Sequence, residues 1–451
     1  MNYSERLNKV IPGGAHTYSR GDDQFPANAP QILEKARDVW VWDPEGNKYL
    51  DYGMALRAVT LGYANERINK AAFKQIENGV NLTRASLVEL EAAELLTDLI
   101  PSAEMVKFAK NGSNVTTAAL KIARAYTGKN YVCFPKQQPF FSFDDWFIGT
   151  TAVKRGIPEE HYKYSLVFDY NDINSLQKLF DEHSGDVACV IMEPATTLSP
   201  CGDNCNYVRS LDKSCKDCPN RNNNFLYKVK ELCHQNGALF ILDEMITGFR
   251  WHLQGAQQWF DIEPDMSTFG KGMANGFALA ALTGKREFME VGGIKKEGME
   301  RTFLVSTTHG AEMPALGAFI EAMKMYQEND VISHLWTYGK KLIEGIENIT
   351  SDLRLSEYFF IDGGYAVMNY MTKDRNKAIS PEFRTLFSQE MIRNGVLMPW
   401  IAISYSHGLK ELEITLEAIR RSLQVYQKAL EDGVEKYLEG PAVKPVFRKY
   451  N

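Results

Sequence analysis

The sequence predicts an α/β fold, with a mostly parallel sheet between helices in a large domain and a smaller α+β domain after it. Short apolar runs, such as "VACVIM" at 187–192 and "ALFIL" at 238–242, alternate with helical patterns through the middle of the chain. Continuous apolar runs are typical of strands in a parallel sheet that is covered on both faces. From about residue 311 long helical stretches surround a single strand-like run, "YAVMNYM". This change of pattern marks the smaller domain.

The elements follow from local patterns along the chain. At the N-terminus, "VWVWDPEGNKYLDY" predicts a hairpin that turns at "DPEGN". The run "MVKFA" predicts a strand, and "NVTTAALKIARAYTG" predicts the helix after it. Helices are also expected over "GAFIEAMKMYQEN", "EFRTLFSQEMIRNG" and "LKELEITLEAIRRSLQVYQKAL". We expect an N-terminal arm and hairpin over 1–55, a large domain over 56–310 and a small domain over 311–451.

Composition and charge exclude several classes of protein. The 451-residue chain is 44% hydrophobic, so it can bury a large core and is not disordered. Its net charge is −6 and it has no block of basic residues, which excludes nucleic acid or an anionic membrane as the main partner. The N-terminus is polar, without the apolar stretch of a signal peptide, and no apolar run approaches the roughly 18 residues of a membrane span. We therefore expect a soluble, cytoplasmic protein.

Three places at predicted strand ends carry candidate site residues, because ligands of parallel sheets bind beyond the carboxyl ends of the strands. The first is "KNGSNV", where Gly112, Ser113 and Asn114 open a helix. Bare amides at a helix start bind anions, and Ser113 adds a hydroxyl. The alternative is an ordinary helix start capped by Ser113 or Asn114.

The second and third places carry charge. Asp243 and Glu244 follow a buried strand directly, and Glu193 follows another. Two interpretations are open for each carboxylate: it caps the following helix, or it holds a protonated ring nitrogen or a metal. Lys271, in "STFGKGMANG", comes about one strand–helix–strand unit after Asp243. A desolvated lysine attacks aldehydes, although a single lysine in a glycine turn is more commonly a surface residue. A phosphate cradle, a strand-end carboxylate and a lysine together are what a pyridoxal phosphate (PLP) site requires.

The motifs "ILDEMITGFR" and "STFGKGMANG" resemble the class III PLP aminotransferases, in particular the branch similar to glutamate-1-semialdehyde aminomutase. "IPGGAHTYSRG", "KNGSNVTTAALKIARAYTG" and "VSTTHGAE" resemble the same branch in the same order, so the similarity covers roughly residues 5 to 430. The resemblance implies a fold-type I PLP-dependent transferase that forms a homodimer with shared active sites.

The resemblance also implies roles for single residues. Lys271 would be the Schiff-base lysine, and Asp243 would be the partner of the pyridine nitrogen. Ser113 and Asn114 would face the phosphate, and Thr308 of "STTHG" would reach the phosphate of the neighbouring subunit. Gly112 and Glu193 are further candidate cofactor residues because of their positions after strands. Arg20 stands at the position that binds a substrate acid group in the aminomutases, and Arg57 is a second candidate by location.

The chain departs from the family pattern beside the cofactor. Where relatives have a Tyr-His-Gly segment, this chain has "QPFFSFDDW", so Phe140 is expected to stack on the cofactor ring while Phe141 replaces the histidine. After Lys271, "GMANGFALAALTG" replaces the glycine-rich run and proline turn of true aminomutases. This difference favours an aminotransferase over an aminomutase.

An insertion at about 200–224 contains cysteines in the pattern C-x3-C-x9-C-x2-C. Two close pairs of thiols suit tetrahedral zinc, and a segment with so few apolar residues needs a metal to hold one shape. We predict a structural zinc ion, with free thiols, a labile disulfide or an iron–sulfur cluster as alternatives. The predicted ligands are Cys201, Cys205, Cys215 and Cys218.

The predicted function is transfer of an amino group from an amino donor to a small carbonyl acceptor. The branch includes enzymes of cell-surface sugar and polysaccharide pathways, so a phosphorylated or sugar-derived acceptor stays open. The alternative is an aminomutase acting on a substrate like glutamate-1-semialdehyde. A decarboxylase or racemase on the same cofactor, and a metal-stabilised binding protein on an inactive scaffold, also stay open, although the complete set of cofactor residues disfavours the binding protein.

Overall fold

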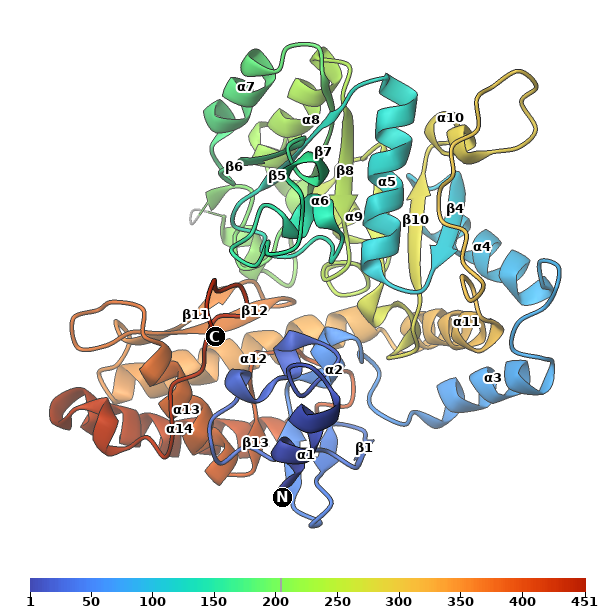
Figure 1. The fold of residues 1–451 in the computed structure, drawn as a ribbon. Helices are drawn as coiled ribbons and strands as arrows, with labels where there is room; N and C mark the ends of the chain where they lie inside the picture. Colours follow the sequence, from blue (N-terminus) through green and yellow to red (C-terminus); the bar gives the residue numbers. More distant parts are fainter. Residues whose placement is uncertain (203–204) are drawn as a thin grey trace. The chain divides into compact units, whose positions relative to one another are not determined.

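A computed structural model describes residues 1–202 and 205–451 (Figure 1). The chain forms two compact units. One unit is continuous and comprises Glu66–Ile332. The other is discontinuous and comprises Met1–Asn65 together with Ser333–Asn451. The boundaries therefore lie at 65/66 and 332/333, where the sequence analysis placed them at 55/56 and 310/311.

The continuous unit is built on a seven-stranded sheet in the order β4-β10-β9-β8-β7-β5-β6. Only β10 runs against its neighbours, since it pairs antiparallel with both β4 and β9 while the remaining pairs are parallel. All residues of β7 and β8 are buried, as the continuous apolar runs predict. The strands are β4 (Met105–Ala109), β5 (Tyr131–Pro135), β6 (Ser165–Phe168), β7 (Val187–Met192), β8 (Leu239–Asp243), β9 (Met266–Phe269) and β10 (Ala280–Gly284).

Helices cover this sheet and extend the unit (Figure 1). The central helix α5 (Gly112–Thr127) packs on β10, β7 and β9, and α8 (Phe225–Gln235) packs on β8. Helix α11 (Met313–Glu328) packs on α3 (Glu66–Glu77) and α4 (Leu87–Leu99), which explains why this unit ends later than the sequence indicated. The other helices are α6 (Asp145–Ile148), α7 (Ile173–Glu182), α9 (Ala256–Phe260) and α10 (Arg286–Met289), with the 3₁₀ helices η3 (Glu159–His161), η5 (Asn206–Arg209), η6 (Cys215–Asp217), η7 (Arg221–Asn223), η8 (Lys271–Ala274) and η9 (Glu290–Gly292).

The discontinuous unit is joined by a four-stranded sheet in the order β1-β2-β3-β13. The expected hairpin is present, because β2 and β3 pair antiparallel across the turn and Asp43 accepts a hydrogen bond from the Asn47 amide (2.8 Å). Strand β13 then pairs parallel with β3, which brings the two ends of the chain into one unit. The strands are β1 (Lys35–Arg37), β2 (Trp40–Trp42), β3 (Lys48–Asp51) and β13 (Val396–Leu397), with a separate antiparallel pair of β11 (Phe359–Gly363) and β12 (Met368–Thr372).

The helices of this unit include the long C-terminal helices that the sequence predicts. Helix α13 (Pro381–Arg393) packs on α14 (Leu409–Asp432). The other elements are α1 (Tyr3–Val10), α2 (Met54–Arg57), α12 (Val331–Asp352) and the 3₁₀ helices η1 (Tyr18–Arg20), η2 (Asp22–Gln24) and η10 (Val434–Lys436).

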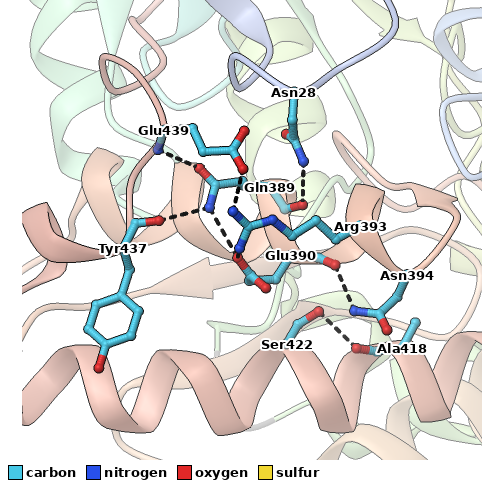
Figure 2. Close-up of polar contacts among 9 residues, drawn as sticks. All are labelled: Asn28, Gln389, Glu390, Arg393, Asn394, Ala418, Ser422, Tyr437 and Glu439. Atoms are coloured by element: carbon cyan, nitrogen blue, oxygen red, sulfur yellow. Dashed lines mark hydrogen bonds and ion pairs between the residues drawn. The ribbon is translucent and has the colours of Figure 1, made fainter.

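The segment after α14 is held on α13 by polar contacts (Figure 2). The buried Gln389 side chain donates to the carbonyl of Tyr437 (2.9 Å) and accepts from the amide of Glu439 (2.9 Å). Arg393 forms ion pairs with both Glu390 and Glu439. The C-terminal segment is therefore an ordered part of this unit.

The short element α2 is a left-handed turn of non-glycine residues. Met54, Ala55, Leu56 and Arg57 have φ values of 41°, 49°, 62° and 68°. For L-residues this conformation costs roughly 1–2 kcal/mol per residue, so surrounding contacts must hold it.

Within the residues that the model describes, no helix combines the length and apolar character needed to cross a bilayer.

Candidate active site

The candidate residues of the continuous unit gather at one edge of its sheet. Strands β4, β8 and β9 run in the same direction, so their carboxyl ends meet at this edge. Gly112 follows β4, Asp243 ends β8, and Lys271 follows β9. The sequence interval between Asp243 and Lys271 is one crossover between adjacent parallel strands, as predicted.

Asp243 is the buried acid of the site. Its side chain is 2% exposed, and its Oδ1 accepts from the Met245 amide (3.0 Å) and the Thr268 hydroxyl (3.0 Å). Burial raises the pKa of Asp243 to about 6, against the opposing influence of these hydrogen bonds and of the nearby Lys271 ammonium. The structure thus brings Asp243 and Lys271 together, with Lys271 half-buried.

Glu244, the neighbouring acid, has a structural role. Its buried carboxylate accepts from the Thr247 hydroxyl (2.5 Å) and from the amides of Ala256 (2.9 Å) and Gln257 (2.8 Å). Those amides belong to the first turn of α9, which otherwise lacks acceptors. Glu244 therefore caps the next helix and Asp243 does not, which resolves the two interpretations of this pair.

The loop after β4 forms the start of α5. Asn111 is the N-cap, with its side chain accepting from the Asn114 amide (3.1 Å), so capping by Ser113 or Asn114 was wrong. The buried Ser113 hydroxyl instead accepts from the Phe143 amide (3.0 Å). Because this cap occupies the Asn114 amide, the donors that the start of α5 can offer to an anion are the amides of Gly112 and Ser113 and the hydroxyl proton of Ser113.

Met245 connects the two loops of the site. A Cβ atom on Gly112 would lie 3.0 Å from the Met245 Sδ, and one on Gly270 would lie 2.6 Å from the same atom. A side chain at either position would therefore force the Met245 side chain to move, by more at Gly270 than at Gly112. The loop before α5 and the loop that carries Lys271 therefore both pack against Met245.

Glu193 and Phe140 lie after β7 and β5. The Gln138 side chain donates to the carbonyl of Glu193 (2.8 Å) and accepts from its amide (2.8 Å), which fixes the backbone there. Phe140 is 47% exposed and Phe141 is buried. Phe140 thus has ring surface available for stacking, whereas Phe141 belongs to the core.

Thr308 lies in an irregular segment and is exposed. Its carbonyl accepts from the Asn81 side chain (2.7 Å), which ties it to the loop between α3 and α4.

The two candidate substrate residues belong to the discontinuous unit. Arg20, in η1, lines a cavity of about 660 Å³ within that unit. Arg57 lies in the left-handed turn and is not among the described residues that line this cavity.

The predicted zinc site is not supported. In the described ranges 1–202 and 205–451, no group of three or more His, Cys, Asp or Glu side chains is placed to hold a metal ion. The Cys205 sulfur is surrounded by hydrogen-bond donors, namely the Cys201 thiol, the Ser199 hydroxyl and the amides of Val208 and Tyr207, and these lower its pKa to about 5. Cys215 is buried while Cys201 is exposed. Cys218, like the other three predicted ligands, is a free thiol.

Comparison with known proteins decides the family. The model of the class III aminotransferases matches residues 19–358. The chain is a class III aminotransferase.

Its relatives include both kinds of enzyme that the sequence suggests. This aminotransferase is 31% identical to the 3-aminobutyryl-CoA aminotransferase of Cloacimonas acidaminovorans (strain Evry), over 95% of this chain and 98% of the relative. It is also 31% identical to the glutamate-1-semialdehyde 2,1-aminomutase of Alkaliphilus oremlandii (strain OhILAs), over 94% and 98%. Among solved structures, the FumI protein of Sphingopyxis sp. MTA144 with PLP is similar, with a TM-score of 0.82 and 25% identity over 95% of this chain and 97% of that one. These comparisons confirm the α/β fold and PLP as the cofactor.

The residues of this aminotransferase fit PLP. Two glycine-containing loops, the start of α5, a buried acid and a neighbouring lysine lie at one sheet edge. Three contributors were missed by the sequence analysis: Thr268, Met245 and Gln138. Thr268 could have been found from strand register, since it stands opposite Asp243 in the adjacent strand.

Proposed function

We propose that this class III aminotransferase moves an amino group from a separate donor to a carbonyl acceptor that carries an acid group. The observation that supports it is the placement of Lys271, beside Asp243 and the α5 start, at one edge of the sheet. When bound, PLP supplies a ring that accepts electrons from the substrate carbon.

Lys271 would hold the cofactor and carry the proton at the substrate carbon through its Nζ. The Asp243 carboxylate would hold the proton on the ring nitrogen, and Thr268 would keep that carboxylate oriented. Gly112, Ser113 and Asn114 would hold the phosphate.

The remaining residues would orient the cofactor and the substrate. Phe140 would lie against the ring, with Glu193 beside the site, because both follow strands that end at this edge. Arg20 would bind the acid group of the substrate, since its guanidinium lines a cavity. We assign no specific contact to Arg57.

A donor and acceptor screen tests the proposal. Purified enzyme is mixed with an amino donor alone, and the cofactor absorbance is followed as it changes between the aldehyde and amine forms. We expect a donor to drive this change stoichiometrically and a separate carbonyl acceptor to reverse it. An enzyme that converts glutamate-1-semialdehyde without any added donor would instead be the aminomutase. A cofactor that responds to no amine would contradict both activities.

We also propose a homodimer in which Thr308 completes the phosphate site of the neighbouring subunit. Large apolar side chains on α3, α4 and the loop between them are 47% to 70% exposed, which is typical of an interaction surface. Asn81, in the same loop, holds Thr308. The apolar residues are Phe73, Ile76, Leu82, Leu87 and Leu90.

Hybrid dimers test this sharing. We expect Lys271→Ala subunits and Thr308→Glu subunits to be nearly inactive alone, the second because a carboxylate at this position repels the cofactor phosphate. Mixing them under subunit exchange should restore about a quarter of wild-type activity, because one site of the hybrid has both residues intact. Lys271→Ala mixed with wild type serves as the control for exchange. A fully active monomer at low concentration would contradict the shared site.

The expectation that the enzyme works in the cytoplasm rests on the sequence alone.

A further inference from the structure

The discontinuous unit contains the cavity of about 660 Å³ that Arg20 lines, and its character indicates a ligand. This volume is in the range of small-molecule sites. Most of its wall is apolar, and Arg20 is the one cation among the described lining residues. The apolar wall includes Leu7, Phe25, Pro26, Ile32, Leu33, Leu56, Leu397, Pro399, Trp400 and Pro441.

The charged side chains that line the cavity differ in whether other residues of the protein already contact them. The Asp22 carboxylate accepts from the side chains of Ser4 and Asn8 in α1. The Asp51 carboxylate accepts from two amides and one hydroxyl. For the Arg20 side chain, in contrast, no hydrogen bond or ion pair is found among the described residues. An anionic group is therefore the ligand group that the cavity can still satisfy.

Ala55 and Leu56 of the left-handed turn Met54–Arg57 form part of the cavity wall, and two side chains hold this turn. The Tyr63 hydroxyl donates to the Asp51 Oδ2 (2.7 Å) and accepts from the Ala55 amide (2.7 Å). Asp51 also accepts from the amides of Gly53 (2.7 Å) and Met54 (2.9 Å). Four polar contacts thus impose a conformation that these L-residues disfavour.

The turn is anchored from the other end of the chain as well. The Trp400 indole donates to the carbonyl of Gly53 (3.0 Å), and its ring also lines the cavity. Backbone strain that several contacts enforce is commonly found where it positions a functional group. Here the group presented to the cavity is the half-buried Leu56 side chain.

We infer that this cavity selects an acid with an extended apolar chain, that Leu56 sets the preferred chain length, and that Asp51 and Tyr63 are positioning residues for Leu56. The inference rests on the proposed function, since the acid is the acceptor of that reaction. A compact polar substrate would leave the apolar wall in contact with water, whereas a chain of several methylene groups would cover it. The cavity therefore favours acceptors longer than a semialdehyde of glutamate.

Binding of unreactive straight-chain acids tests the inference without turnover. Calorimetry on the PLP-loaded enzyme should show octanoate binding at least about tenfold more tightly than butanoate, because four more methylene groups are buried. Hexanamide should bind at least about tenfold more weakly than hexanoate, because it lacks the charge that Arg20 recognises.

Tyr63→Phe removes both contacts of the hydroxyl. We expect the ratio of octanoate to butanoate affinity to fall to about threefold or less, while the cofactor spectrum is unchanged. Tyr437→Phe is the matched control, because its hydroxyl also donates to a carboxylate in this unit, that of Asp432 (2.7 Å), but lies outside the cavity lining. It should leave the ratio unchanged.

Two further variants keep the test decisive if Tyr63→Phe folds poorly. Leu56→Ala leaves the hydrogen bonds intact and should lower octanoate affinity more than butanoate affinity. Ala55→Gly, added to Tyr63→Phe, should restore much of the ratio, because glycine adopts positive φ without strain.

The outcomes separate this inference from the proposed function. Equal affinity for butanoate and octanoate in the wild type, or a ratio insensitive to both Tyr63→Phe and Leu56→Ala, would overturn the inference even if transamination is active. An enzyme with no transaminase activity that still shows the chain-length dependence would instead overturn the proposed function.

Discussion

Lys271→Ala should abolish transamination and leave the enzyme without a covalent link to its cofactor. Lys271 is the lysine that follows β9 and lies next to Asp243. An alanine at this position has no amine with which to form the link. Borohydride treatment of the wild-type protein should fix the cofactor on a peptide containing Lys271. The same treatment of Lys271→Ala should release all cofactor on denaturation, and turnover should fall by at least about 10⁴-fold, a barrier increase of roughly 5 kcal/mol.

A matched control is available in the same unit. Lys285 lies just after β10 and forms an ion pair with Glu263. Lys285→Ala should retain normal turnover and the borohydride-reducible adduct. Normal turnover in Lys271→Ala, or an adduct mapped to another lysine, would contradict the assignment.

Asp243→Asn should leave PLP bound but lower turnover by about 10² or more. An amide cannot hold a proton on the ring nitrogen, so the ring loses its capacity to accept electrons from the substrate carbon. The asparagine Oδ1 keeps an acceptor for the Met245 amide and the Thr268 hydroxyl, so the local structure should survive. Turnover lowered by less than about tenfold, or roughly 1.4 kcal/mol, would show that Asp243 is not the partner of the ring nitrogen.

The same variant should stabilise the cofactor-free protein. The pKa of Asp243 is raised from 3.8 to about 6 by burial, so between these values the folded protein binds more protons than the unfolded chain. The free energy of unfolding therefore falls as pH rises through this window, and the full cost of about 3 kcal/mol is present above it. Denaturant unfolding should show cofactor-free Asp243→Asn to be more stable than cofactor-free wild type at pH 8, with the difference vanishing near pH 4. An equal difference at both pH values would contradict a buried, ionised Asp243.

The fold could be predicted largely from apolar periodicity. Buried runs such as those of β7 and β8 and the long helices α13 and α14 carry strong patterns, and the structure has them where expected. The pairing of β13 with β3 could not be read from pattern, because β13 is only two residues long and its partner is far away in the sequence. The union of Met1–Asn65 with Ser333–Asn451 in one unit was therefore not predicted.

The candidate site was predictable where residue type and strand position coincide. Asp243 and Lys271 each have a chemically distinctive side chain at a strand end. Met245 and Gln138 carry no chemically distinctive group of this kind. Their part in the site follows only from the backbone segments that they contact. The cysteine spacing suggested zinc, but spacing alone does not place ligands around a metal, and among the described residues no group of three or more candidate ligands is placed to hold one.

The pairing of β3 with β13 has a consequence for how the protein is made. A chain leaving the ribosome presents Lys48–Asp51 long before Val396–Leu397 exists, while Glu66–Ile332 is continuous and can collapse as soon as it has emerged. The edge of β3 that pairs with β13 therefore stays unpaired until nearly the whole chain is synthesised. Closing so long a loop is slow, so we expect refolding to show an early phase for the continuous unit and a late phase for the sheet that joins the two ends. Chains that stop before residue 396 should then aggregate through the open edge of β3.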